Sequence, residues 1–335
     1  MAVELDIFNP QISTVSKSLE GKVLLVYGRS NLGKTKQATR MKKPFYLPFE
    51  AGLAAIPNVP FCPITKWSDF IKINKQLTDP AHLAEAKSRY STIIFDSLDA
   101  ASQYCQQFIC EKYQAPSIAE GNRGYGLWSQ YAAEFWKQIN KLISVGYCCY
   151  FIAHAQQDSE TGYISPKADS RSLDPVLNNA DVCVYVEGNG VDESGKVIKS
   201  SAYLAENKGK FFARSRFDYL STTYLEEFTA ENLERVIAEA IEAQEKAEGI
   251  KAVTFEEQAE TKKIKKKTYE ELMAQMEELG GKLANNGYLD DLQAIITENL
   301  GEGKKASELK KGQEQQIEAL IYDIQSFIDN NGIEV

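Results

Sequence analysis

Short apolar runs alternate with long amphipathic stretches over the first 250 residues of the chain. Three runs rich in β-branched and aromatic residues have the length of buried strands, and they cover residues 22–27 (KVLLVY), 90–96 (YSTIIFD) and 146–153 (GYCCYFIA). The stretches 99–113 and 127–144 have helical composition. Strands and helices in this order predict an α/β fold with a mostly parallel sheet covered by helices.

The pattern changes after residue 180. Three shorter strand-like runs, two of them separated by the turn-like NGVDESGK, lie at 181–188, 201–206 and 210–215. Turn residues join neighbouring antiparallel strands, so these runs predict an antiparallel hairpin at the edge of the sheet. A helix is expected over 230–248, with Thr229 as its N-cap.

The sequence predicts three parts. Residues 1–248 form the α/β core. Apolar periodicity is lost over 249–267, which ends in the basic run KKIKKK and is interpreted as a linker. Residues 268–335 predict a small helical domain, with helices near the following positions: 268–285, 288–299 and 306–330.

Charge is distributed unevenly along the chain. The net charge is −9, and residues 268–335 contain 14 acidic and 5 basic side chains, so the first 267 residues are neutral overall. The acidity therefore belongs to the C-terminal part. A polyanionic partner of the core is not excluded, because the core also carries local basic clusters.

The six cysteines lie mostly in apolar surroundings, without a CxxC pair and with only two histidines in the chain. We interpret them as reduced thiols of a cytoplasmic protein rather than as a zinc or disulfide framework. The N-terminus lacks the basic and apolar regions of a signal peptide, and no run of about 18 apolar residues occurs, so we expect no membrane partner.

The segment GRSNLGKT directly follows the first predicted strand and fits the pattern G-x-x-x-x-G-K-[ST]. Glycines in such a loop let the backbone N–H groups face phosphate oxygens. Lys34 is then expected to reach the β and γ phosphates, and the Thr35 hydroxyl to bind Mg²⁺. The predicted nucleotide-binding residues are Gly28, Arg29, Ser30, Asn31, Leu32, Gly33, Lys34 and Thr35.

A phosphate loop needs a carboxylate at the end of a neighbouring strand to orient the Mg²⁺ ion, and Asp96 ends the run YSTIIFD. Glu50, after FYLPF, is the candidate general base, and the alternative is a surface glutamate. His154 and Gln156 end the third strand, where they could sense the γ-phosphate or serve as structural groups. No Asn-Lys pair of the chain continues to N-K-x-D, so ATP is preferred to GTP.

Several ordered segments resemble a known family. The order of phosphate loop, strand-end glutamate, IIFDS, polar strand end and basic hairpin resembles the RecA family of ATPases. Segments such as EAGLAAIPNVPFCPITKWSDF, RGYGLW, FIAHAQQ and FFARSRFDYL are similar to the phage-encoded, Sak-type, RecA-like single-strand annealing proteins over residues 20–245. The resemblance implies a RecA-like core that binds ATP, Mg²⁺ and single-stranded DNA, forms a homo-oligomer and cooperates with a single-stranded-DNA-binding protein. The candidate catalytic residues are then Lys34, Glu50, Asp96, His154 and Gln156.

The resemblance also implies two DNA-binding loops, which would be residues 114–126 and 156–174. Each loop offers cations for backbone phosphates and an aromatic side chain for base stacking. The first contains Arg123 and Tyr125. The second contains Tyr163, Lys167 and Arg171.

The basic segment KGKFFARSR completes the candidate residues. Alternation along a continuous strand places four cations on one face, and these are Lys208, Lys210, Arg214 and Arg216. RecA-like assemblies use such residues to reach the ATP of a neighbouring subunit; the alternatives are a solvated face or a direct DNA contact. KKIKKK could bind nucleic acid or keep a linker soluble, and the acidic C-terminal part could compete with DNA or dock a partner.

Taken together, the residues and the resemblance predict a slow, DNA-coupled ATPase of phage recombination or single-strand annealing, acting in the bacterial host cytoplasm. Two alternatives remain. One is a P-loop ATPase that acts on a protein partner as a loader or motor adaptor. The other is a nucleotide-dependent scaffold with little turnover.

Overall fold

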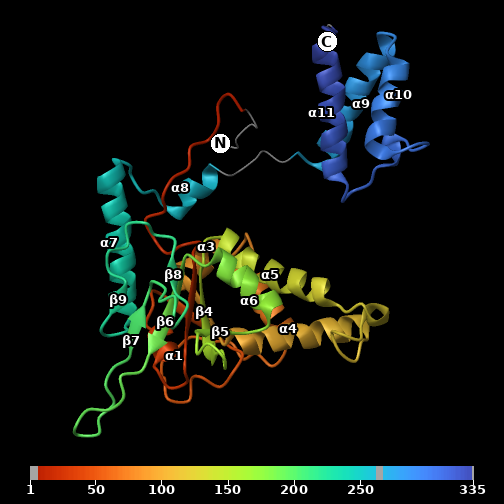
Figure 1. Ribbon diagram of the computed structural model, residues 1–335. Helices are drawn as coiled ribbons and strands as arrows, with labels where there is room; N and C mark the ends of the chain where they lie inside the picture. The colour runs from red at the N-terminus through yellow and green to blue at the C-terminus, as the bar shows by residue number, and fades with distance from the viewer. Residues whose placement is uncertain (1–6, 262–266, 334–335) are drawn as a thin grey trace. The chain divides into compact units, whose positions relative to one another are not determined.

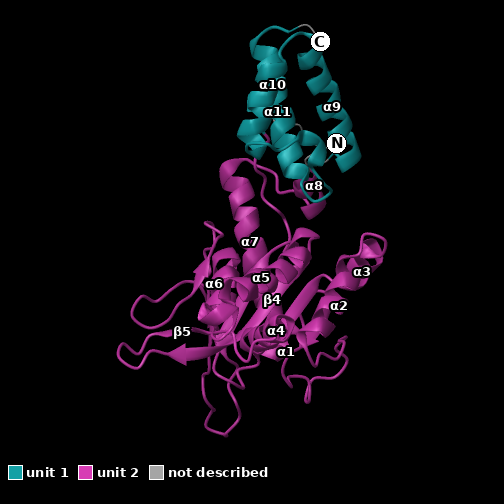
Figure 2. Ribbon diagram, turned by 90° about the vertical axis from the view of Figure 1, so that its right-hand side faces the viewer, with its two compact units in different colours: residues 1–10, 262–335 teal, residues 11–261 magenta. Residues whose placement is uncertain are grey.

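The computed structural model describes residues 7–261 and 267–333. The chain divides into two compact units, shown in different colours in Figure 2. The larger unit spans residues 11–261. The smaller unit contains the C-terminal helices.

The sheet of the larger unit is built around one buried strand. β1 (Val23–Gly28) is buried along its whole length and pairs in parallel with β4 (Cys148–Gln157) on one side and β6 (Val182–Glu187) on the other. β3 (Thr92–Asp96) pairs in parallel with β4, and β2 (Pro44–Pro48) with β3. These strands confirm the predicted mostly parallel α/β core.

Short antiparallel strands extend this core at two places. They are β5 (Ile164–Lys167) on β4, β7 (Ser201–Tyr203) and β8 (Arg214–Ser215) on β6, and β9 (Tyr224–Leu225) on β7. The predicted antiparallel hairpin of residues 181–188 and 201–206 is confirmed, since β6 pairs antiparallel with β7. β6 also pairs in parallel with β1, so it joins the parallel core to the antiparallel edge, and nearly every residue of its apolar run is buried.

Helices cover both faces of the sheet (Figure 1). One face packs against the helices α2 (Trp67–Thr78), α3 (Leu83–Arg89), α4 (Leu98–Tyr113), α5 (Trp128–Ser144) and α6 (Ser170–Asn179). The other face packs against α1 (Lys34–Ala38) and α7 (Ala230–Glu248). The expected N-cap of α7 is confirmed, since the Thr229 side chain accepts from the backbone N–H of Asn232. Among the described residues no helix has the length and apolar character needed to span a membrane.

The first helix is shorter than its sequence suggests. Helical composition continues to residue 43, but α1 ends at Ala38 after five residues. The chain must turn at once to enter β2, and Lys43 takes a positive φ of 44° in this turn. A helix this short has a small dipole. The binding of a phosphate would therefore depend mainly on the loop and on Lys34.

Part of the predicted linker is folded onto the larger unit. The Val253 N–H donates to the Val15 carbonyl oxygen, and α8 (Phe255–Glu260) follows with a capping box at Thr254. The Phe255 ring lies over two glycines of positive φ, Gly21 and Gly146, where a Cβ atom would come within 2.5 and 2.7 Å of the ring. The basic residues 262–266 lie outside the described residues.

The smaller unit confirms the predicted C-terminal helices. α9 (Tyr269–Asn285), α10 (Leu289–Leu300) and α11 (Glu314–Asn330) share an apolar core that includes Leu283, Ile317 and Leu320. The last helix begins later than expected. Residues 306–313 form a single 3₁₀ turn and a loop, because Gly312 takes a φ of 95°.

The cysteines contribute to packing. All six are free thiols, and Cys105, Cys148, Cys149 and Cys183 are buried. Burial raises the pKa of each of these four thiols, so they stay protonated at neutral pH.

The packing of Phe255 predicts a measurable share of stability. Phe255→Ala should lower the free energy of unfolding by about 2 kcal/mol, because a half-buried ring and its contacts with two glycines are lost. Urea denaturation of the full chain measures this change. Val197→Ala is the control, since Val197 is 73% exposed and its truncation should change little. Equal effects of both variants would show that residues 250–261 do not belong to the folded core.

Candidate nucleotide-binding site

The phosphate loop leaves the carboxyl end of β1, in the middle of the parallel core. A Cβ at Gly28 would lie 2.5 Å from the Val186 carbonyl oxygen on β6, so only glycine fits there. Asn31 and Gly33 take positive φ values of 63° and 79°. Left-handed residues in such a loop curl the backbone so that successive N–H groups can face an anion. The local fold therefore supports the predicted phosphate site.

Lys34 is held inside this loop. Its side chain is only 6% exposed, and its ammonium group donates to the carbonyl oxygens of Gly28 (2.9 Å) and Arg29 (2.7 Å). Burial lowers the pKa of Lys34, and the nearby Asp96 carboxylate opposes that shift. A phosphate group would supply the buried ammonium with a counter-charge that neutral carbonyl groups cannot provide.

Asp96 connects three elements of the sheet edge. Its carboxylate is 2% exposed at the end of β3. The oxygen Oδ2 accepts from the Thr35 hydroxyl at 2.6 Å and from the Tyr46 hydroxyl at 2.8 Å. Thr35 and Asp96, predicted from sequence as the Mg²⁺ pair, are thus in direct contact. Both offer oxygen atoms, which Mg²⁺ prefers as ligands.

Glu50 and His154 face each other beside Asp96. The Glu50 N–H donates to the Asp96 carbonyl oxygen at 3.0 Å, and a Glu50 carboxylate oxygen lies 3.4 Å from His154 Nε2. Burial and the Asp96 charge raise the pKa of Glu50, while His154 and a hydrogen bond from Ser97 lower it. A carboxylate with a raised pKa beside a phosphate loop has the character of a general base.

A cavity of about 840 Å³ joins these groups. Lys34, Thr35, Glu50, Asp96 and His154 line it, together with Arg40 and the mostly apolar segment 55–59. Charged groups for phosphates and apolar groups for a base are what a nucleoside triphosphate requires.

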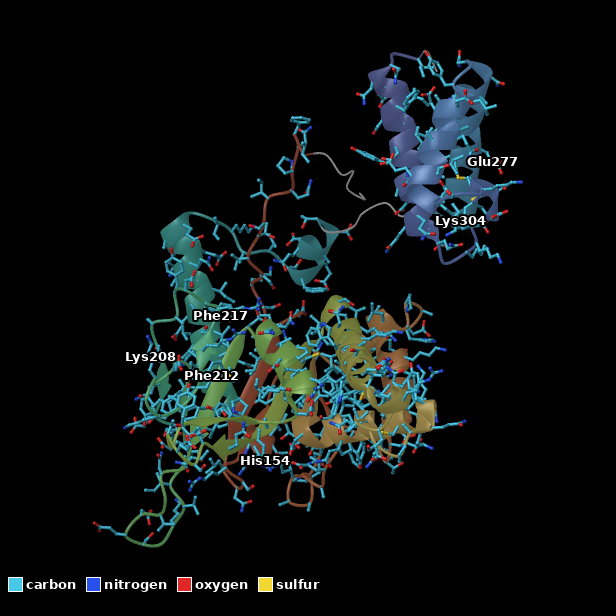
Figure 3. All side chains as sticks on the ribbon, turned by 45° about the vertical axis from the view of Figure 1, so that its right-hand side comes forward. His154, Lys208, Phe212, Phe217, Glu277 and Lys304 are labelled. Carbon is cyan, nitrogen blue, oxygen red and sulfur yellow. The ribbon has the colours of Figure 1, made fainter. Side chains whose placement is uncertain are left out.

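Gln156 lies apart from this cavity. It is two residues beyond His154 on β4, its amide donates to the Ser165 hydroxyl at 3.3 Å, and it lines a separate open groove with Tyr163 and Lys208. Figure 3 labels His154 at the lower edge of the strands and Lys208 away from it. The structure therefore brings four of the five predicted catalytic residues to one place and leaves Gln156 outside.

The predicted DNA-binding residues occupy two exposed regions. Arg123 lies in a 3₁₀ turn (Asn122–Gly124) with a φ of 56°, and the Tyr125 side chain is 85% exposed. Tyr163 and Lys167 belong to the β4–β5 hairpin, where Lys167 pairs with His154.

Arg171 links the two regions. It lies on α6, and its guanidinium stacks 3.9 Å from the ring centroid of Trp128 on α5. Trp128 lies two residues after the first loop, and it was not predicted as a candidate residue. The sequence GLW at residues 126–128 could have indicated it.

The basic segment does not form one continuous strand. Lys208 and Lys210 lie in a turn closed by hydrogen bonds between Asn207 and Phe211. The Arg214 and Arg216 guanidinium groups donate to carbonyl oxygens at the C-terminal end of α6. The prediction of a single charged face is therefore wrong, because the turn breaks the alternation and the two arginines cap a helix. A role of these residues toward a neighbouring subunit stays a prediction.

Two further residues of the site were not predicted from the sequence. Tyr46 lies in the apolar run of β2, where a tyrosine is easily read as core, and its hydroxyl reaches Asp96. Gly52 lies in the loop after Glu50, and a Cβ there would come within 2.2 Å of the Tyr46 hydroxyl. Only the pairing of β2 with β3 brings these residues to the carboxylate.

A glycine-bounded loop after a central parallel strand, with a buried lysine and a threonine–aspartate pair, defines a P-loop nucleotide-binding protein. The chain belongs to the AAA domain family, whose model matches residues 20–217. It is 51% identical over 324 residues to the "SPbeta prophage-derived uncharacterized protein YorG" of Bacillus subtilis (strain 168), a match that covers 97% of this chain and 99% of the relative. AAA-domain proteins are P-loop ATPases, which generally use ATP and Mg²⁺.

The raised pKa of Glu50 predicts a pH-dependent stability. Because the pKa of Glu50 is higher in the folded state, ionising this side chain lowers the free energy of unfolding. The loss is absent below the ordinary pKa of 4.5 and grows as the pH rises through the higher pKa of the folded state. Glu50→Gln should therefore raise the melting temperature of the nucleotide-free protein at pH 8 by about 1–2 °C, a small effect because 38% of the side chain is exposed.

The same gain should disappear near pH 4, where Glu50 is protonated in both states. Melting curves across this pH range test the prediction. Glu226→Gln, at an exposed position, is the control and should show no such dependence. An equal gain at pH 4 and pH 8 would show that packing, not charge, is responsible.

Proposed function

We propose that this protein binds and hydrolyses ATP, assembles on single-stranded DNA and acts in phage recombination or single-strand annealing in the host cytoplasm. The observation that carries the proposal is the convergence of Lys34, Thr35, Glu50, Asp96 and His154 on one cavity. Support for the phage context comes from the prophage-derived relative.

The charged and polar residues that line the cavity fit Mg²⁺-ATP. Lys34 would exchange its carbonyl partners for β and γ phosphate oxygens. Thr35 and Asp96 would hold the metal ion, which when bound neutralises phosphate charge. The mostly apolar segment 55–59, which also lines the cavity, would receive the base.

Glu50 would orient the attacking water and take its proton. Its raised pKa suits this role, and its exposure of 38% leaves it accessible to water. His154 Nε2 lies 3.4 Å from a Glu50 carboxylate oxygen, so a movement of either side chain would change the contact between them. Since Glu50 follows β2 and His154 lies on β4, their pairing depends on the sheet itself.

The same strand gives a route from nucleotide to DNA. β4 continues from His154 at the cavity to Gln157, and over this stretch it pairs with β5 in the β4–β5 hairpin. The hairpin carries Tyr163 and Lys167, two of the candidate DNA-binding residues. A shift of His154 on ATP binding would therefore move the start of this hairpin. ATP between protomers, with Lys208 and Lys210 reaching across, would favour a homo-oligomer on the strand and a role together with a single-stranded-DNA-binding protein.

One observation supports the alternative of a P-loop ATPase that acts on a protein partner. α10 has no fully buried residue, and Leu289 on it is 60% exposed. Such a helix could receive another protein. Turnover stimulated by single-stranded DNA would favour the DNA-linked function, and turnover that DNA does not change would favour the alternative.

Lys34 is the residue on which nucleotide binding depends most. Lys34→Ala should weaken the binding of ATP by at least about 30-fold, because a buried ammonium that contacts phosphate is removed. Isothermal titration with Mg²⁺-ATP measures this loss. Lys72→Ala is the control, since Lys72 lies on α2, is 72% exposed and does not line the cavity. Normal ATP binding by Lys34→Ala would place the nucleotide site elsewhere.

Arg123 tests the DNA-binding surface. Arg123→Ala should weaken binding to an oligothymidine strand and reduce the slope of log K against log salt by about 0.7, the value for one lost phosphate contact. ATP affinity should not change. Fluorescence anisotropy over a salt series measures the slope, with Arg235→Ala, an exposed arginine of α7, as control. The proposed DNA function fails if the intact protein binds no single-stranded DNA at low salt, with or without ATP.

A further inference from the structure

Tyr46 is a buried tyrosine whose hydroxyl ends at the nucleotide site. It lies in the middle of β2, pairs with Ile94 of β3 and is 0% exposed. Its hydroxyl donates to Asp96 Oδ2 at 2.8 Å, and the Thr35 hydroxyl donates to the same oxygen at 2.6 Å. One carboxylate oxygen thus receives both protons.

This arrangement decides how the Thr35 hydroxyl points. A hydroxyl group has one proton and two lone pairs. Because the Thr35 proton is directed to Asp96, its lone pairs remain for a ligand. The direction of the Thr35 hydroxyl proton therefore depends on Asp96, and the Asp96 carboxylate is in turn held by the hydrogen bond from Tyr46.

Gly52 packs closely against the Tyr46 hydroxyl and the Asp96 carboxylate. A Cβ at Gly52 would lie 2.2 Å from the Tyr46 hydroxyl and 2.7 Å from Asp96 Oδ2. The Gly52 N–H donates to the Glu50 carbonyl oxygen at 2.9 Å, so this close approach also fixes the loop that carries Glu50. Tyr46 therefore lies between the carboxylate and the segment of the candidate general base.

We propose that Tyr46 is a positioning residue, which holds Asp96 and through it the Thr35 hydroxyl in the geometry that binds Mg²⁺ together with ATP. The inference rests on the proposed function, since it assigns the metal ion to Thr35 and Asp96. Removing a group that orients a metal ligand in this way typically lowers metal affinity 10- to 100-fold.

The hydroxyl is suited to this task at any physiological pH. Burial, and then the Asp96 charge, raise the pKa of Tyr46, while the Gly52 backbone amide has a smaller opposing effect. The group therefore stays a proton donor.

The chain provides a matched control for the loss of a buried tyrosine hydroxyl. Tyr150 lies on β4, pairs with Ile94 in the sheet and packs in the same apolar cluster as Tyr46. Its hydroxyl has no hydrogen-bond partner within the described residues. Tyr150→Phe removes the same atom from the same apolar cluster, but from a hydroxyl that donates no hydrogen bond to Asp96.

The experiment is a titration with MgCl₂ in the presence of a fluorescent ATP analogue. Tyr46→Phe should raise the Mg²⁺ concentration for half-maximal enhancement of binding by about 10- to 100-fold. Binding of the analogue in EDTA should stay within about twofold of the intact protein, because Lys34 is unchanged. Tyr150→Phe should alter neither quantity.

A second variant reaches the same contact from the other side. Gly52→Ala should also raise the Mg²⁺ requirement, because its methyl group would come within 2.2 Å of the Tyr46 hydroxyl and 2.7 Å of Asp96 Oδ2. Because this methyl group also disturbs Asp96 directly, Gly52→Ala supports the proposal only if Tyr46→Phe raises the Mg²⁺ requirement as well.

Three results would overturn the proposal in distinguishable ways. A Mg²⁺ requirement of Tyr46→Phe equal to that of Tyr150→Phe would leave Tyr46 with a purely structural role. The same conclusion follows if binding in EDTA falls as much as binding in Mg²⁺. If the intact protein binds no analogue under any condition, the proposed function itself fails.

Discussion

One buried carboxylate holds the candidate site together. Asp96 is almost completely removed from solvent, and a buried charge is tolerated only where hydrogen-bond donors compensate for lost water. The hydroxyls of Thr35 and Tyr46 supply that compensation, and the Asp96 carbonyl accepts the N–H of Glu50. The loop after β1, the strand β2 and the segment after β2 are therefore all tied to the end of β3.

The parallel sheet makes this convergence possible. Parallel strands all present their carboxyl ends at the same edge, so residues far apart in the chain meet there. The phosphate loop follows β1, Glu50 follows β2, Asp96 ends β3 and His154 lies near the end of β4. β1 lies between β4 and β6, and this central place leaves its loop open to a ligand.

Much of the site could be predicted because its residues belong to local patterns. Gly33, Lys34 and Thr35 are consecutive, and Asp96 and Glu50 are recognisable as polar residues at the ends of apolar runs. Gln156 and the basic segment were placed less well. Alternation correctly gives the face of a strand only while the strand continues, and it stops at the turn around Lys208. Likewise the antiparallel partner of β6 could be predicted from the turn-like segment that follows it, but its parallel pairing with β1 could not, because strand order is not a local property.

The sequence alone determined the α/β class, the phosphate loop and the helical C-terminal unit, because each depends on periodicity or on contiguous residues. The tertiary structure decided which side chains touch. Tyr46 reaches Asp96, Glu50 meets His154, and two predicted basic residues cap α6. These contacts follow from strand order and register, which bring together residues that are about 50 to 100 positions apart in the first two pairs, and no local pattern records such pairings.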